Sequence, residues 1–121
     1  MNYFQKANDY YNSKDYHKAM ALYKKSMTIN KNEAACLYNT AVCLIKLKNY
    51  KDAIPLLKKS LFLKMDSKYL FNLGYCYIML DDNKKALINF KAAWALNPED
   101  TDCKKAISLI ESRHKITKDN L

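Results

Sequence analysis

The sequence has 121 residues, of which one is glycine and two are proline, and it carries a formal net charge of +9. So few turn-forming residues exclude a sheet protein, which needs a tight turn wherever a strand reverses, and a hydrophobic content of 50% excludes a disordered chain. The longest apolar run, LGYCYIML, is too short to span a bilayer. We therefore expect an all-α, cytoplasmic protein that does not insert into membranes.

Helical patterns follow one another along the chain. The expected helices cover residues 2–13, 16–30, 35–47, 50–64, 68–80, 83–97 and 101–115. Asp15, Asn49 and Asp82 precede the second, fourth and sixth of them, where a side-chain oxygen caps free N–H groups. For the last helix we predict a cap at Thr101 or Asp102. Pro55 lies beyond the first turn of its helix, where it removes one backbone hydrogen bond.

The helices form pairs that repeat along the sequence. The second helices of the pairs begin at Tyr16, Tyr50 and Asn83, which gives a period of about 34 residues. Small residues occupy nine equivalent positions: Ala7, Ala41 and Gly74; Ala19, Ala53 and Ala86; Ser26, Ser60 and Ala93. Small side chains allow two helix axes to approach closely. The repeating unit is therefore predicted to be a helix-turn-helix.

The third repeat resembles the tetratricopeptide repeat (TPR), whose pattern is W-x2-L-G-x2-Y, A-x3-F and then P. It matches at Leu73, Gly74, Tyr77, Ala86, Phe90 and Pro98, with Leu70 at the Trp position; Lys31 and Met65 replace Pro in the first two repeats. The resemblance implies a right-handed α-solenoid of seven helices in a single domain, 1–116. Its parts would be repeats at about 1–33, 34–66 and 67–100, a capping helix at about 101–116, and a frayed tail at 117–121.

No catalytic motif is present, and we expect neither an enzyme nor a cofactor. The four cysteines form no CxxC pair, and the two histidines are not at zinc-ligand spacing from them. We predict buried free thiols and no metal site.

The TPR resemblance implies that one face of each first helix packs within the stack while the other lines a concave groove that holds a peptide. In the third repeat the packing face is Leu70, Leu73, Gly74, Tyr77 and Leu80, and Trp94 is expected to pack beneath the cap. Amides can hydrogen-bond a peptide backbone, and aromatic rings can stack on its side chains. The predicted peptide-binding residues are Phe4, Asn8, Tyr11, Tyr38, Asn39, Val42, Lys68, Phe71, Asn72, Tyr75 and Met79.

Some TPR proteins of the chaperone-cofactor type clamp the carboxylate at the end of a partner. Asn8, Asn39 and Lys68 match that clamp, but Phe4 and Asn72 stand where it has cationic residues. A full clamp with charge-assisted hydrogen bonds therefore cannot form.

The expected function is a non-catalytic scaffold, adaptor or co-chaperone-like module that binds a peptide of another protein. Two alternatives remain: a homo-oligomer that uses the same apolar face, or a basic surface, built from lysines of the second helices, that binds RNA or an anionic partner. Nucleic acid is not the expected partner, because only one of the 21 basic residues is Arg.

Overall fold

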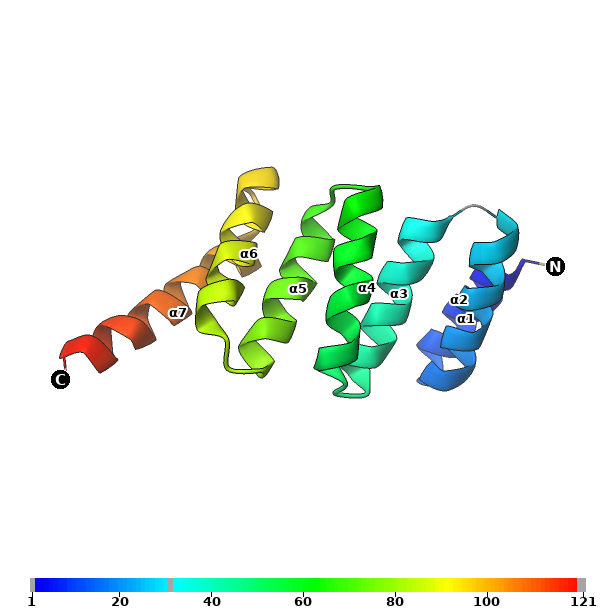
Figure 1. Ribbon diagram of the computed structural model, residues 1–121, viewed down its shortest axis with the longest axis horizontal. Coiled ribbons are helices and arrows are strands. Elements are labelled where there is room, and N and C mark those ends of the chain that lie inside the picture. Colours follow the sequence, from blue (N-terminus) through cyan, green and yellow to red (C-terminus); the bar gives the residue numbers. More distant parts are fainter. Residues whose placement is uncertain (1, 31, 120–121) are drawn as a thin grey trace. The chain divides into compact units, whose positions relative to one another are not determined.

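The protein is described by a computed structural model that covers residues 2–30 and 32–119. Within these residues the chain forms seven α-helices and no strand (Figure 1), which confirms the all-α prediction. The helices are α1 (Tyr3–Asn12), α2 (Tyr16–Asn30), α3 (Glu33–Lys46), α4 (Tyr50–Leu63), α5 (Ser67–Met79), α6 (Asn83–Leu96) and α7 (Thr101–Asp119). They group into two compact units, Met1–Met65 with α1 to α4 and Asp66–Leu121 with α5 to α7.

In the first unit each helix packs against the next one along the chain: α1 on α2, α2 on α3, and α3 on α4 (Figure 1). Its core contains Tyr23 and Leu57 together with Cys36 and Cys43, each at most 2% exposed. The small residues at the repeat positions of this unit are completely buried: Ala7, Ala19, Ser26, Ala41, Ala53 and Ser60. Ser60 donates its hydroxyl to the carbonyl of Leu56 at 2.9 Å, so burial leaves no unpaired polar group there.

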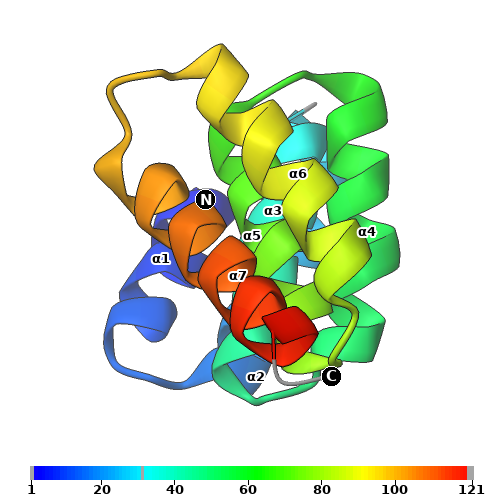
Figure 2. The same cartoon turned by 90° about the vertical axis from the view of Figure 1, so that its left-hand side faces the viewer.

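In the second unit α5 packs on α6, and α6 on α7, which runs obliquely to α6 (Figure 2). The buried side chains are those of Tyr69, Leu70, Leu73, Cys76, Tyr77, Ala86, Phe90, Ala93, Cys103, Ile107 and Ile110. Two packing predictions are wrong. Leu80 is 44% exposed because it follows the last residue of α5. Trp94 is 39% exposed, and its indole N–H donates to the carbonyl of Pro98 at 3.1 Å, so it braces the loop after α6.

The turn inside each helix pair has the same construction. Lys14, Lys48 and Asp81 adopt left-handed backbone angles, with φ of 64°, 62° and 61°. The next residue caps the following helix, as predicted. Asp15 accepts from the N–H of Lys18 at 3.3 Å, Asn49 from that of Asp52 at 3.4 Å, and Asp82 from that of Lys85 at 3.1 Å.

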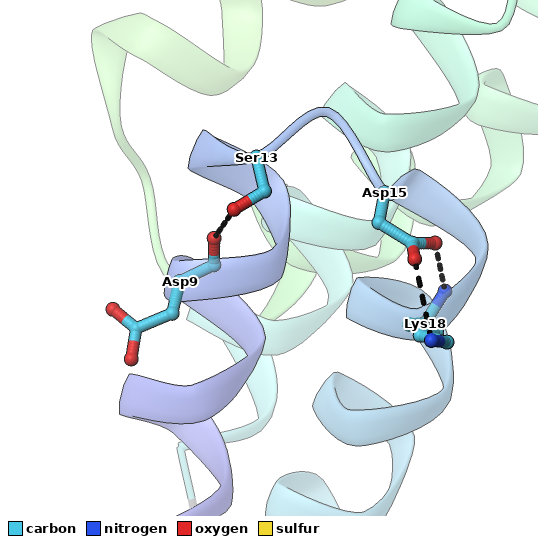
Figure 3. Close-up of polar contacts among 4 residues, drawn as sticks. All are labelled: Asp9, Ser13, Asp15 and Lys18. Carbon is cyan, nitrogen blue, oxygen red and sulfur yellow. Dashed lines mark hydrogen bonds and ion pairs between the residues drawn. The ribbon is translucent and has the colours of Figure 1, made fainter.

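The first of these turns shows how side chains close it. The hydroxyl of Ser13 donates to the carbonyl of Asp9 at 3.0 Å (Figure 3). The same carbonyl also accepts the backbone N–H of Ser13 at 3.1 Å, so Ser13 closes the end of α1 with two hydrogen bonds. Asp15 also holds the ammonium group of Lys18 at 3.7 Å (Figure 3). Both side-chain interactions are exposed to solvent, so each contributes little to the free energy of folding.

The start and the end of α7 differ from the prediction. Asp100, rather than Thr101 or Asp102, caps the helix: its Oδ1 accepts from the N–H groups of Asp102 at 2.9 Å and Cys103 at 3.4 Å. Asp100 is the residue just before the first helical turn, where a side chain reaches the second and third N–H groups. The helix continues to Asp119, beyond the expected end at 116. Residues 120 and 121 of the predicted tail, and Lys31 at its expected Pro position, lie outside the described residues.

Candidate functional site

A cleft of about 230 Å³ opens in the first unit between α1, α2 and α3. Its lining residues are Asn8 and Tyr11 of α1, Tyr23 of α2, and Tyr38, Asn39 and Val42 of α3. The structure thus brings together five predicted site residues. Two of them belong to α1 and three to α3, about 30 positions further along the sequence. Phe4 does not line the cleft; its ring packs edge-on against Tyr23 with 5.7 Å between the ring centroids.

Tyr23 is the lining residue that the sequence analysis missed. It stands at the Phe position of the A-x3-F pattern of the first repeat and is only 2% exposed. Its hydroxyl, however, donates to Oδ1 of Asn8 and also hydrogen-bonds the side chain of Asn39. A tyrosine in place of phenylalanine was the available signal, because a buried hydroxyl needs a partner.

The hydroxyl of Tyr23 stays protonated at all physiological pH values. Burial raises the pKa of Tyr23 to about 12, with smaller contributions from Cys43 and Cys36, while the hydrogen bond to Asn39 lowers it. Tyr23 is therefore a permanent donor to Asn8, and it orients the side chain of Asn8 at the cleft. Burial also raises the pKa of Tyr11, so this second phenol is neutral too.

The cleft offers hydrogen bonds and aromatic surface but no charge. None of its six lining residues is ionised at neutral pH. A carboxylate would find amide and hydroxyl groups there but no cation to form a charge-assisted pair. The geometry suits neutral groups, such as peptide N–H and C=O groups and apolar side chains.

The other five predicted residues share α5 in the second unit. Lys68 is exposed, and its backbone N–H donates to Asp66 at 2.8 Å. Phe71 packs against Phe90, with ring centroids 5.2 Å apart, so part of its surface belongs to the core. Asn72 donates from Nδ2 to the carbonyl of Lys68 at 3.0 Å. The remaining two, Tyr75 and Met79, are 36% and 43% exposed.

Across 2–30 and 32–119, no group of three or more His, Cys, Asp or Glu side chains could hold a metal ion. The four cysteines are free and buried, as predicted. No helix in this part of the chain is long and apolar enough to cross a membrane.

Two family models match the chain. That of the anaphase-promoting complex, cyclosome, subunit 3 matches residues 1–60, and that of the tetratricopeptide repeat matches residues 67–100. Neither of them describes an enzyme. The second matched segment is the one predicted as the third repeat.

Solved structures with low sequence identity share the fold. MamA 41-end from Desulfovibrio magneticus RS-1 is 23% identical with a TM-score of 0.84, over 93% of this chain and 64% of that one. The Arabidopsis OM64 TPR domain is 22% identical with a TM-score of 0.84, over 91% of this chain and 92% of that one. The first TPR of Spaghetti (RPAP3), bound to the HSP90 peptide SRMEEVD, is 18% identical with a TM-score of 0.87, over 93% of this chain and 90% of that one.

The chain thus spans less than two thirds of the MamA chain but about the whole of the two TPR domains. The fold of these structures agrees with the helix pairs of this chain and with the two family models, which together match residues 1–60 and 67–100. The chain belongs to the tetratricopeptide repeat proteins.

Proposed function

We propose that this chain is a non-catalytic interaction module that holds a peptide segment of a partner protein in the cleft of the first unit. The observation that carries the proposal is the convergence of Asn8, Tyr23 and Asn39 on one cleft between aromatic walls. The Spaghetti TPR, which has the same fold, was solved with a bound peptide, and this supports a peptide as the ligand class.

The hydrogen bonds inside the cleft indicate how a peptide would be held. Because Oδ1 of Asn8 accepts from Tyr23, the amide N–H groups of Asn8 are the ones that can donate to a peptide carbonyl. Tyr11 and Tyr38 supply rings for contact with side chains. The matching segment is extended, with apolar or aromatic side chains.

The absence of charge from the lining distinguishes between two kinds of peptide. A ligand recognised by its terminal carboxylate requires cationic groups, and the six lining residues supply none. We therefore propose an internal segment of the partner, for which a blocked or an extended C-terminus makes no difference.

The test begins with a random peptide library displayed on phage and selected on the wild-type protein. Affinities of the selected peptides are then measured by fluorescence anisotropy for wild type, Asn8→Ala, Asn39→Ala and Asn89→Ala. Asn89 is the matched control, because its Nδ2 donates within α6 to the carbonyl of Lys85 at 2.8 Å. We expect the two cleft variants to lose about fivefold to tenfold in affinity, as for one hydrogen bond of about 1 kcal/mol, and the control to lose none.

The same peptides are compared as free acids and as C-terminal amides, and we expect equal affinities. Equal binding by all four proteins would place the ligand elsewhere and contradict the proposal. A loss of affinity on amidation would show that a carboxylate is recognised, and the internal-segment proposal would then be wrong.

A further inference from the structure

The first unit has a second cleft, larger than the first, between α2, α3 and α4. It has a volume of about 360 Å³ and is lined by Met20, Ala21, Tyr23, Lys24 and Met27 of α2, Cys36, Leu37 and Thr40 of α3, and Leu56 of α4. Tyr23 is the single residue common to both clefts. The volume lies at the lower end of the range for clefts that hold ligands.

The hydroxyl and thiol groups in this cleft are already paired within the protein. The hydroxyl of Thr40 donates to the carbonyl of Cys36 at 2.8 Å, and the thiol of Cys36 lies 3.1 Å from Oδ1 of Asn32. The hydroxyl of Tyr23 is directed at Asn8, in the other cleft. The walls therefore favour an apolar side chain over water, because water needs polar partners that these walls do not offer.

The surroundings of the cleft are strongly positive. Residues 1–65 contain twelve lysines and four acidic residues, a net charge of +8, whereas residues 66–121 contain nine basic and eight acidic residues, a net charge of +1. Nearly all of the protein's net charge is therefore on the unit that carries both clefts. Such a field attracts acidic partners and raises their association rate.

One lysine lines the second cleft, and a second follows one of its lining residues on α4. Lys24 belongs to the lining and is exposed. Lys59 lies one turn beyond Leu56 on α4 and so shares its face; its ammonium group is 3.5 Å from Glu33. Both members of that pair are partly exposed, so a carboxylate from a partner can replace Glu33 at little cost.

From these observations we propose that the second cleft docks an acidic segment of a partner protein. One or two apolar side chains of that segment fill the space between α2 and α4, and its carboxylates pair with Lys24 and Lys59. A second copy of the chain is a poorer occupant, because its own net charge of +9 opposes its approach. The site is distinct from the peptide cleft of the proposed function and does not depend on it.

The probe is a fluorescein-labelled peptide in which aspartates and glutamates flank one Leu-Phe pair, and its binding to the whole chain is measured by fluorescence anisotropy. We expect binding that weakens when salt is raised from about 50 mM to about 300 mM, because screening grows over that range. A peptide with Ser-Ser in place of Leu-Phe should bind about tenfold more weakly, since it cannot fill the apolar space.

One substitution separates shape from charge. Ala21 is exposed and lines the cleft, so Ala21→Arg fills the space while it adds a positive charge. We expect about a tenfold loss of affinity, as for the loss of one buried apolar side chain. If Ala21→Arg binds the probe as tightly as wild type or more tightly, the attraction is one of charge alone and the proposal is overturned.

A pair of matched variants tests where the charge acts. Lys24 and Lys58 occupy equivalent positions of the first two repeats, both are exposed, and Lys58 does not line the cleft. Lys24→Glu should lose about tenfold in affinity while Lys58→Glu loses about twofold or less, because attraction between exposed charges falls steeply beyond one Debye length. Equal losses would contradict the assigned site. Circular dichroism checks that each variant keeps its helix content.

Three further measurements complete the test. Asn39→Ala should leave probe binding unchanged; a loss there would place the probe in the first cleft and overturn the assignment. If polyuridylate binds and the acidic peptide does not, the basic surface serves nucleic acid and the proposal fails. It also fails if sedimentation shows self-association that Ala21→Arg abolishes while the probe does not bind.

Discussion

The ring of Phe90 occupies the space in front of Gly74: a Cβ on Gly74 would lie 2.9 Å from both Cδ1 and Cε1 of that ring. Gly74 is the only glycine in the chain and lies inside α5, where glycine costs about 1 kcal/mol relative to alanine. The ring itself is 3% exposed and packs against Phe71. The glycine therefore serves the packing of an aromatic side chain, and this compensates for its poor helix propensity.

Gly74→Ala should lower the free energy of unfolding by about 1 kcal/mol or somewhat more. Overpacking a buried site costs about 1 to 3 kcal/mol, and the gain in helix propensity returns about 1 kcal/mol. Urea denaturation followed by circular dichroism measures the difference. An unchanged or higher midpoint would show that the ring moves aside freely.

The second repeat provides the control for this variant. Its equivalent positions are Ala41 and Leu57, both completely buried. In the double variant Gly74→Ala with Phe90→Leu the added methyl group has the space that it has in the second repeat. We expect the double variant to be less destabilised than the sum of the two single variants, which a double-mutant cycle detects. Additive losses would argue against a direct clash.

The sequence was sufficient for the repeats and much of the packing, because those depend on residue size at a fixed period. Nine small residues were expected at contact positions, and the structure buries all of them. The sequence was insufficient where a feature depends on the hydrogen bond of a single atom. The hydroxyl of Tyr23 joins Asn8 and Asn39, and no spacing rule distinguishes that tyrosine from a phenylalanine of the core. The cap at Asp100 was missed by one residue, which is the usual uncertainty of a helix end.

The left-handed turns were likewise not predicted, since lysine gives no signal for positive φ and a single aspartate gives only a weak one. Replacing Lys14 or Lys48 by glycine should stabilise the protein, because left-handed angles cost an ordinary residue about 1 to 2 kcal/mol that glycine avoids. Glycine also loses about 0.5 to 1 kcal/mol of backbone entropy on folding. The expected net gain is therefore between about 0 and about 1.5 kcal/mol.

Urea midpoints of Lys14→Gly, Lys48→Gly and Asp81→Gly measure this gain, and the smallest is expected for Asp81, because aspartate tolerates left-handed angles better than lysine. Lys51→Gly is the control: it removes the same side chain from an exposed position in α4, and it should destabilise by about 1 kcal/mol. Stabilisation by Lys51→Gly too would show that lost charge repulsion, and not the backbone angle, is responsible.

The buried thiols should make the protein sensitive to alkali. Burial raises the pKa of Cys43 and of Cys76 to about 11. In the unfolded chain these thiols ionise near their ordinary pKa of about 8.5, so between that pH and about 11 the folded state binds more protons than the unfolded state. Stability therefore decreases as pH rises through this window and is unaffected by the thiols below it.

Urea midpoints between about pH 8 and about pH 11 test this expectation. The double variant Cys43→Ala with Cys76→Ala starts from a lower stability but should show a shallower decline than wild type, because two of the ionising groups are gone. A parallel decline in both proteins would assign the alkaline loss to other groups. In the native protein at neutral pH, iodoacetamide should leave all four cysteines unmodified, because each is buried.

Tyr23→Phe tests whether the hydroxyl positions the two asparagines. The ring stays in the core, while Asn8 loses its donor and Asn39 its partner, so both side chains become free to rotate. We expect the free energy of unfolding to fall by about 1 kcal/mol, as for one hydrogen bond. The affinity for the selected peptides should fall by a larger fraction of its binding free energy. Asn39→Ala in the Tyr23→Phe background should then cost much less affinity than in wild type. If the two substitutions are additive, the hydroxyl acts only in folding, and the asparagines reach their ligand without it.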